Sequence, residues 1–423
     1  MYYIITLFFI LLAAKGTFFA FYNICWVLMD VVIIWIGIEN KRFHKSDVRL
    51  FFYFTLVYVA YCSFRSIFFT GLSFSFWAND IIFLFKYILS SFLLCALLRD
   101  QTIHYLSKVI FQLAVVSLFF YVIQLISGDF IYAIGKALNI PPRPHDKMYV
   151  NFVVFTFVKE HLVQNSGFSW EPGAFGFFLN TGLLLHLLTT NFTFDKKAKW
   201  LAVTILTTIS TTAFIGLLVI ILMSLRANGV KYGKILFFVA PLLLIAVVEL
   251  PFLFNKVISI YHSDEEDIKN INFLNKYYLE RGISMPLNRF SSMILLNKLF
   301  GPKLILGVSN LYDQSVPLLK NMNISNGIAD IMAKFGIVGL GSMLYSSFSL
   351  FKTYTRSIEL SFYGLLLIVV LGFGECIFVL PLMTCFFFLH YYSAPKELYV
   401  SFSPEDQNYN VIDLSEQIKS AAR

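Results

Sequence analysis

Charged residues are scarce in this chain, since they make up 14% of its 423 residues while 58% are hydrophobic. Soluble domains average about 25% charged residues, so the composition excludes an ordinary soluble globular protein. Apolar runs of about 18 to 22 residues recur from end to end, and a helix needs roughly that length to cross a bilayer. We therefore expect an all-α, polytopic integral membrane protein.

The sequence also lacks the features of disulfide-rich, metal-binding and nucleotide-binding proteins. Its five cysteines all lie inside apolar runs: Cys25, Cys62, Cys95, Cys376 and Cys385. None of them has metal-ligand spacing, and no disulfide framework is implied. A Walker motif, a GxGxxG turn, a heptad repeat and a solenoid repeat are all missing. We expect no metal and no cofactor.

The apolar runs predict about 12 transmembrane helices. They fall at 2–14, 17–38, 50–72, 79–98, 109–127, 173–190, 198–209, 212–225, 235–254, 324–350, 358–373 and 376–393. Two of them, 198–209 and 212–225, are too short to span a bilayer of roughly 30 Å as straight helices. We interpret them as a pair that meets at Ser210-Thr211-Thr212, where hydroxyls satisfy backbone groups at a turn. The alternative is one tilted helix of about 27 residues.

Lys and Arg are concentrated in every second loop, which sets the orientation because short basic loops stay in the cytoplasm. These residues are Lys41, Arg42, Lys45, Arg49, Arg99, Lys108, Lys196, Lys197, Lys199, Arg226, Lys231, Lys234, Lys352 and Arg356. We expect both termini and the tail 394–423 to be cytoplasmic, with two long loops, 128–172 and 255–323, facing outward. The net charge of +8 is mostly this topology signal, so no nucleic-acid partner is expected.

The first outward loop enters the membrane at Trp170-Glu171-Pro172, and Pro172 suits the first turn of a helix. Glu171 then lies at the helix N-terminus, where the dipole favours a carboxylate. The pattern fits either a structural cap or a catalytic carboxylate. Its neighbours favour chemistry, because Gly167 allows close backbone approach and Trp170 offers a flat apolar face of the type sugars pack against.

Three arginines in the outward loops are suited to phosphate: Arg143 in the first loop, and Arg281 and Arg289 in the second. A guanidinium donates two parallel hydrogen bonds to phosphate oxygens and keeps its charge. The alternative for each is a solvated surface charge. Arg289 is the sharper prediction of the three.

A second polar stretch precedes a glycine-containing apolar helix. Ser325-Asn326 lies one turn above a helix that contains Lys334-Phe335-Gly336-Ile337-Val338-Gly339. Such groups are expensive to hold near lipid, so we predict that Ser325 and Asn326 position a substrate.

Four motifs occur in an order that resembles the O-antigen polymerase and ligase superfamily of bacterial inner-membrane glycosyltransferases. They are the Gly167 to Gly176 stretch around Glu171-Pro172, the hinge Ser210-Thr211-Thr212-Ala213, Arg289 followed by Leu306-Gly307, and Ser325-Asn326 with Gly336 and Gly339 downstream. The resemblance spans roughly residues 160 to 340.

The resemblance implies a membrane glycosyltransferase that joins undecaprenyl-pyrophosphate-linked repeat units into O-antigen or capsular polysaccharide, without nucleotide sugar. It implies catalytic roles for Glu171, Arg289 and Arg281, and substrate binding by Arg143, Gln164, Gly167, Trp170, Ser325 and Asn326. The expected partners are the lipid-linked glycan and membrane lipid, with a chain-length regulator and a flippase alongside. The expected location is the bacterial inner membrane.

Two departures bear on which member of the superfamily this is. Gln164 stands where the family usually has Arg, and Ser325 stands where the ligases carry a catalytic His before Asn. The missing His argues for a polymerase over a ligase. A flippase or other transporter is the alternative of a different class, but its charges would line a central path, whereas here they gather in two long outward loops.

Overall fold

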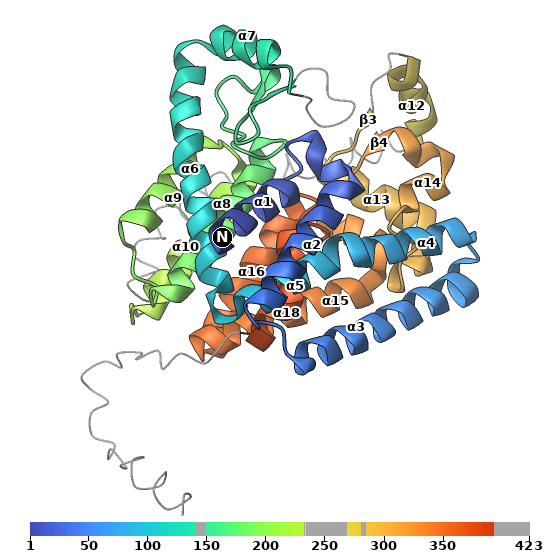
Figure 1. The fold of residues 1–423 in the computed structure, drawn as a ribbon. Coiled ribbons are helices and arrows are strands. Elements are labelled where there is room, and N and C mark those ends of the chain that lie inside the picture. The colour runs from blue at the N-terminus through green and yellow to red at the C-terminus, as the bar shows by residue number, and fades with distance from the viewer. Residues whose placement is uncertain (141–148, 232, 234–268, 281–284, 393–423) are drawn as a thin grey trace, which may run out of the picture.

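The computed structural model describes residues 1–140, 149–231, 233, 269–280 and 285–392. Four of the regions singled out above lie outside these residues: Arg143, Arg281, the apolar run 235–254 and the tail 394–423. The described part is mostly helical (Figure 1).

The N-terminal part is a succession of apolar helices. They are α1 (Tyr2–Ala13), α2 (Asn23–Glu39), α3 (Lys45–Phe64), α4 (Phe74–Phe83), α5 (Leu89–Leu98), α6 (Thr102–Ile126) and α7 (Gly128–Leu138). Short 3-10 turns, η1 (Phe18–Phe21) and η4 (Arg99–Gln101), join some of them. Two π-helical turns extend α3 and join α4 to α5: η2 (Arg65–Thr70) and η3 (Leu84–Ile88).

The remaining helices follow a small hairpin in which β1 (Tyr149–Asn151) pairs antiparallel with β2 (Thr156–Val158). They are α8 (Pro172–Thr189), α9 (Lys196–Thr207), α10 (Thr211–Ala227), α12 (Ile271–Glu280), α13 (Arg289–Phe300), α14 (Tyr312–Ser315), α15 (Gly327–Thr355), α16 (Ile358–Gly374), α17 (Pro381–Thr384) and α18 (Phe386–Tyr392). The 3-10 turns among them are η5 (Lys159–His161), η6 (Gly301–Ile305) and η7 (Pro317–Asn321), and β3 (Met285–Pro286) pairs parallel with β4 (Met322–Asn323).

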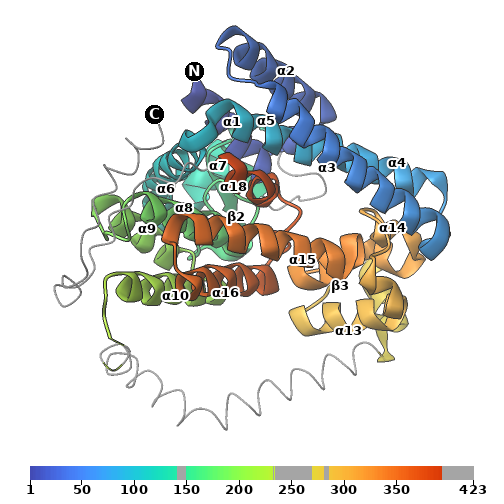
Figure 2. The ribbon, with the colours of Figure 1, turned by 90° about the horizontal axis from the view of Figure 1, so that it is seen from below.

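Helix α8 lies at the centre of the bundle. It packs against α6, α9 and α10, while α16 packs between α10 and α15 (Figures 1 and 2). Of its apolar stretch, 83% is buried, against 11% for the stretch that begins at Lys45 in α3. Because an apolar face that contacts no protein is stable only against lipid, α3 is a peripheral helix and α8 an enclosed one.

Within the described residues, four helical stretches are long and apolar enough to cross a membrane: Lys45–Thr70, Phe74–Ile126, Pro172–Thr189 and Gly327–Thr355. Three shorter apolar helices accompany them: Tyr2–Ala13, Thr211–Ala227 and Ile358–Gly374. The prediction of a helical protein rich in apolar spans is confirmed at this level.

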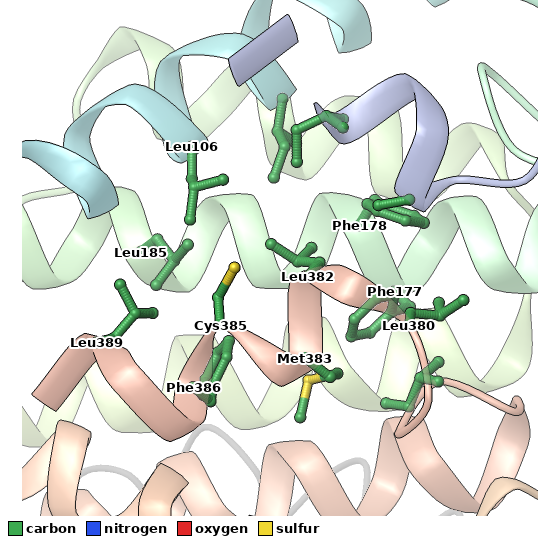
Figure 3. Close-up of a cluster of buried hydrophobic side chains, with 14 of the residues drawn as sticks. Leu106, Phe177, Phe178, Leu185, Leu380, Leu382, Met383, Cys385, Phe386 and Leu389 are labelled. Atoms are coloured by element: carbon green, nitrogen blue, oxygen red, sulfur yellow. The ribbon is translucent and has the colours of Figure 1, made fainter. Parts of the chain in front are cut away.

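One expected span is wrong. The run 376–393 is not a single helix but the short helices α17 and α18. Leu382, Cys385 and Phe386 are fully buried against Phe177 of α8 and neighbouring side chains (Figure 3). This run is apolar because it fills the protein core, and hydropathy alone does not distinguish a core segment from a lipid-facing one.

The expected break between 198–209 and 212–225 is confirmed, and one continuous tilted helix is excluded. Helix α9 ends at Thr207 and α10 begins at Thr211, with Ile209 at a φ of 48° between them. The Ser210 hydroxyl accepts the Ala213 amide at 3.5 Å, which caps the first turn of α10.

Two arginines of the basic segments form ion pairs. Arg99 pairs with Asp47 at 2.7 Å, and Arg226 at the end of α10 pairs with Glu359 at the start of α16 at 2.6 Å. The other ends of α10 and α16 meet at Thr212 and Gly374. Helices α10 and α16 therefore carry the Arg226–Glu359 pair at one end and the contact of Thr212 with Gly374 at the other.

The orientation is testable by cysteine labelling in a variant without its native cysteines. A cysteine at exposed Asn270 should react with a membrane-impermeant thiol reagent in spheroplasts, and one at exposed Lys197 should not, because basic loops are retained in the cytoplasm. Labelling of both after membrane permeabilisation is the control. Reaction at Lys197 alone in intact spheroplasts would invert the topology.

Candidate active site

Glu171 immediately precedes α8, as expected, but its carboxylate does not cap that helix. Its backbone is extended and its side chain makes no capping hydrogen bond to the first turn. Instead Oε1 accepts a hydrogen bond from the Trp170 indole at 2.5 Å. The half-buried carboxylate is thus held beside the helix end, where the α8 dipole favours its negative charge.

A second carboxyl, that of Glu375, lies against this first turn. Glu375 follows the last residue of α16, and a methyl group on Gly173 would overlap its Oε1. Its carboxyl is within hydrogen-bonding contact of the Glu171 carboxyl. Only glycine at position 173 leaves room for this pair. Steric fit therefore explains why a glycine follows Glu171-Pro172.

Arg289 brings a cation to the same place. It is the first residue of α13, and its Nε donates to the carbonyl of Gly374 at 3.3 Å. The guanidinium is also close enough to Glu375 for their charges to interact. Glu171 and Arg289, predicted from separate loops, are therefore brought together by the end of α16.

Four helix N-termini surround that single C-terminus. Glu171 of α8 contacts Glu375, Thr212 of α10 touches Gly374, and Arg289 of α13 bonds the Gly374 carbonyl. Gly327, the first residue of α15, lies against the carbonyl of Glu375. Each N-terminus carries a partial positive charge worth about 0.3 to 1 kcal/mol to a nearby anion. With Arg289, they place positive charge beside the two carboxyls and the negative end of α16.

Ser325 and Asn326 hold the start of α13 in place. The Ser325 hydroxyl donates to the Leu287 carbonyl at 2.6 Å, and Asn326 Nδ2 donates to the Arg289 carbonyl at 3.0 Å. Asn326 Oδ1 also caps α15 by accepting the Ala329 amide at 3.0 Å. The contacts seen here position Arg289, and direct substrate contact by either residue stays a prediction.

Other predicted site residues shape the loop that leads to Glu171. Trp170 is only 9% exposed, so its ring packs in the core while its N–H orients Glu171. Gly167 has a φ of 50° and a side chain there would overlap the Phe175 ring. Gln164 lies apart from the carboxyls, with Nε2 donating to the Ile209 carbonyl at 3.4 Å in the break before α10.

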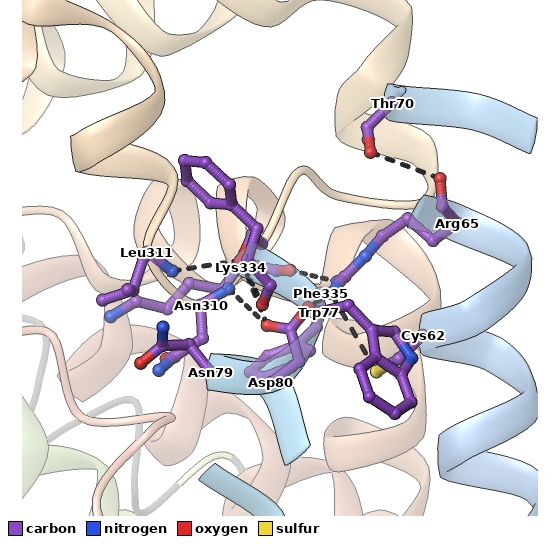
Figure 4. Close-up of polar contacts among 12 residues, drawn as sticks. Cys62, Arg65, Thr70, Trp77, Asn79, Asp80, Asn310, Leu311, Lys334 and Phe335 are labelled. Carbon is purple, nitrogen blue, oxygen red and sulfur yellow. Dashed lines mark hydrogen bonds and ion pairs between the residues drawn. The ribbon is translucent and has the colours of Figure 1, made fainter. Parts of the chain in front are cut away.

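The glycine-containing helix α15 is interrupted at Gly336, whose φ is 66°. Carbonyls left without helical partners there are taken up by distant groups: Lys334 O accepts from Arg65 at 2.5 Å and Phe335 O accepts from Tyr61 at 2.8 Å. Arg65 is fully buried and forms an ion pair with Asp80 (Figure 4). Gly307 packs on the break, where a side chain would meet Gly336 N at 2.5 Å.

Above this break, the outward loop is tied to the first turns of α15. Asp330 accepts hydrogen bonds from Lys334 at 2.9 Å and from the Tyr312 hydroxyl at 3.0 Å. Burial holds the pKa of Tyr312 well above its usual range, so the phenol stays a donor. The loop that carries Arg289 is therefore anchored by the bond from Tyr312 to Asp330 as well as by the bonds from Ser325 and Asn326.

Two contributors to the site were missed from the sequence. Glu375 is not among the site residues predicted from the sequence, and Thr212 is predicted only as part of a hinge. A signal for Glu375 exists, because it interrupts an apolar stretch directly after Gly372-Phe373-Gly374. Comparisons with family models, with curated proteins and with solved structures find no match to this chain.

The close fit at Gly173 makes a stability prediction. Gly173→Ala should destabilise the protein by roughly 1 to 3 kcal/mol, since an added methyl overlaps the Glu375 carboxyl and must displace it. The measurement is the midpoint of thermal unfolding of the purified protein in detergent. Gly341→Ala is the matched control, because that position has no neighbour within 4 Å and alanine favours helix.

A second variant separates this clash from a general intolerance of alanine near the start of α8. Shortening the partner in Gly173→Ala/Glu375→Ala should recover part of the lost stability. The contact would be contradicted if the double variant lost more stability than the two single variants lose together.

Proposed function

We propose that this protein polymerises lipid-pyrophosphate-linked oligosaccharide repeat units at the outward face of a bacterial inner membrane. The observation that carries the proposal is the meeting of Glu171 and Arg289 at the end of α16, among four helix N-termini. A carboxylate and a guanidinium that both lie at the end of α16 supply a proton acceptor and a binding group for a departing phosphate. The order of motifs in the sequence supports the same reaction class.

In the proposed reaction a sugar hydroxyl of one lipid-linked unit attacks the anomeric carbon of the growing glycan. The hydroxyl proton passes to Glu171, a new glycosidic C–O bond forms, and the bond from the anomeric carbon to the pyrophosphate oxygen breaks. The bonding electrons leave with the pyrophosphate, and Arg289 with the helix N-termini stabilises its added charge. No nucleotide or metal enters this scheme.

The membrane arrangement proposed with this function is a chain of about 12 spans with both termini in the cytoplasm. The four long and three shorter apolar helices of the described residues are its support. The active site then lies at the outward ends of α8, α10 and α15, where a lipid-linked pyrophosphate enters from the outer leaflet. A chain-length regulator and a flippase are the proposed protein partners.

Deletion of the gene and gel analysis of surface polysaccharide test the function directly. A polymerase predicts loss of the long-chain ladder while a single repeat unit remains attached, because only joining of units is lost. Restoration of the ladder by the intact gene is the control. Loss of every attached unit would instead favour a flippase or a ligase, and an unchanged ladder would refute the proposal.

Arg289 should be intolerant even of lysine. Arg289→Lys keeps the charge but loses the planar fork that binds two phosphate oxygens, so it should fail nearly as badly as Arg289→Ala. We expect a drop in polymerisation of roughly 100-fold or more, the scale seen when one donor to a developing negative charge is removed. The assay uses purified protein with lipid-linked repeat units.

Lys298→Ala is the matched control for Arg289, because Lys298 is an exposed cation on the same helix. It should retain activity. Full activity in a correctly inserted Arg289→Ala protein would remove this residue from the site, and full rescue by lysine would leave charge alone as the requirement.

A further inference from the structure

Glu375 is a carboxyl that the reaction proposed above does not use. It sits at the junction where α16 ends, partly exposed, with its side chain against the first turn of α8. Gly173 has no side chain, which leaves room for the Glu375 carboxyl. Gly327 lies against the backbone carbonyl of Glu375. Its carboxyl lies close to another carboxyl, that of Glu171, as well as to the Arg289 guanidinium.

The charged and titratable groups around Glu375 come from several helices. Glu171 faces it from α8 and Arg289 from α13. On its own segment Cys376 follows, with Sγ against the Ile324 carbonyl at 3.2 Å, and beyond Cys376 lies the Asp330–Lys334 pair of α15. Helix α10 contributes Thr212, which does not titrate. Among the residues that the structure describes, Arg289 is the cation close to the carboxyl pair, since Lys334 is paired with Asp330.

Two carboxyl groups in hydrogen-bonding contact cannot both be ionised without strong repulsion, so such a pair keeps one proton. The location of that proton follows from Trp170. An indole N–H is a donor only, and it donates to Glu171 Oε1, which is therefore an acceptor. A hydrogen bond donated to a carboxylate stabilises its ionised form, so the bond from Trp170 favours the negative charge on Glu171 and leaves the shared proton to Glu375.

We propose that Glu375 is the second carboxyl of the reaction centre, carrying a proton that it donates in a hydrogen bond to the Glu171 carboxylate. This inference rests on the proposed function. When the acceptor hydroxyl attacks, its proton moves to Glu171 as the glycosidic bond forms and the bond to pyrophosphate breaks. The pair then holds two protons, and it returns one to water before the next turnover.

The pair predicts a distinctive pH profile. As pH rises, Glu375 loses its proton, the two carboxylates repel each other, and the added negative charge opposes the pyrophosphate, so activity should fall on the alkaline side. Glu375→Gln keeps a neutral donor to Glu171 that does not ionise. It should retain turnover within about tenfold at neutral pH, while Glu171→Gln should lose roughly 100-fold or more. The alkaline fall should disappear in Glu375→Gln.

The experiment compares purified wild-type protein with Glu375→Gln, Glu171→Gln and Glu359→Gln across the pH range, using lipid-linked repeat units. Glu359→Gln is the matched control, since Glu359 is a carboxylate at the opposite end of the same helix, paired with Arg226. An alkaline fall that is identical in wild type and Glu375→Gln would overturn the proposal. Equal activity of Glu171→Gln and wild type would overturn it as well.

An infrared measurement tests the protonation of Glu375 independently of the proposed function. At neutral pH the wild-type protein should show the C=O stretching band of a protonated carboxylic acid, and this band should be weaker in Glu375→Gln but keep its full intensity in Glu359→Gln. A band that persists unchanged in Glu375→Gln, or is missing from wild type, overturns the proposed protonation whether or not the variant is active. Wild-type protein that shows the band but makes no polymer would refute the proposed function and leave the protonated pair standing.

Discussion

The contact of Arg289 with the Gly374 carbonyl is the interaction on which the site depends. A helix that ends inside an apolar bundle leaves carbonyls without partners, and those carbonyls must find donors within the protein. At the end of α16 the Gly374 carbonyl accepts from Arg289, and the Glu375 carbonyl accepts from the Ile377 amide. Satisfying the end of one helix therefore gathers the cation, the carboxyls and four positive helix ends at one point.

The break in α15 also leaves carbonyls that need donors, a few turns away. The groups that donate to them explain why the loop before α15 holds a defined position. The break at Gly336 leaves carbonyls without helical partners. Arg65 and Tyr61 donate hydrogen bonds to these carbonyls, and Asp80 forms an ion pair with the buried Arg65 guanidinium. Removing one partner of such a buried pair typically costs about 3 to 5 kcal/mol. Asp80 also accepts the Asn310 amide at 2.7 Å, so the ion pair fixes the loop as well as the helices.

Much of this fold was predictable because its signals are local. Apolar runs marked most of the helices, Ser210 marked a break, and Pro172 marked the start of α8. The failures arise where a signal has a non-local cause. The run 376–393 is apolar because protein surrounds it, Trp170 is buried by packing from distant helices, and Arg65 meets Asp80 and Lys334 only in the folded chain. Periodicity carries no information about which face meets lipid and which meets protein.

The site itself was half predictable for the same reason. Glu171 and Arg289 stand out because a carboxylate and a guanidinium beside apolar helices are costly to keep. Glu375 is equally costly to keep beside apolar helices, but the sequence does not indicate its partner. The partner is another acid, Glu171, which immediately precedes α8. Charge balance makes that pairing intelligible. With both carboxyls ionised, Arg289 would face two negative charges, and the proposed site would repel an anion. With the proton on Glu375, the charges of the two carboxyls and Arg289 sum to zero, which removes that repulsion.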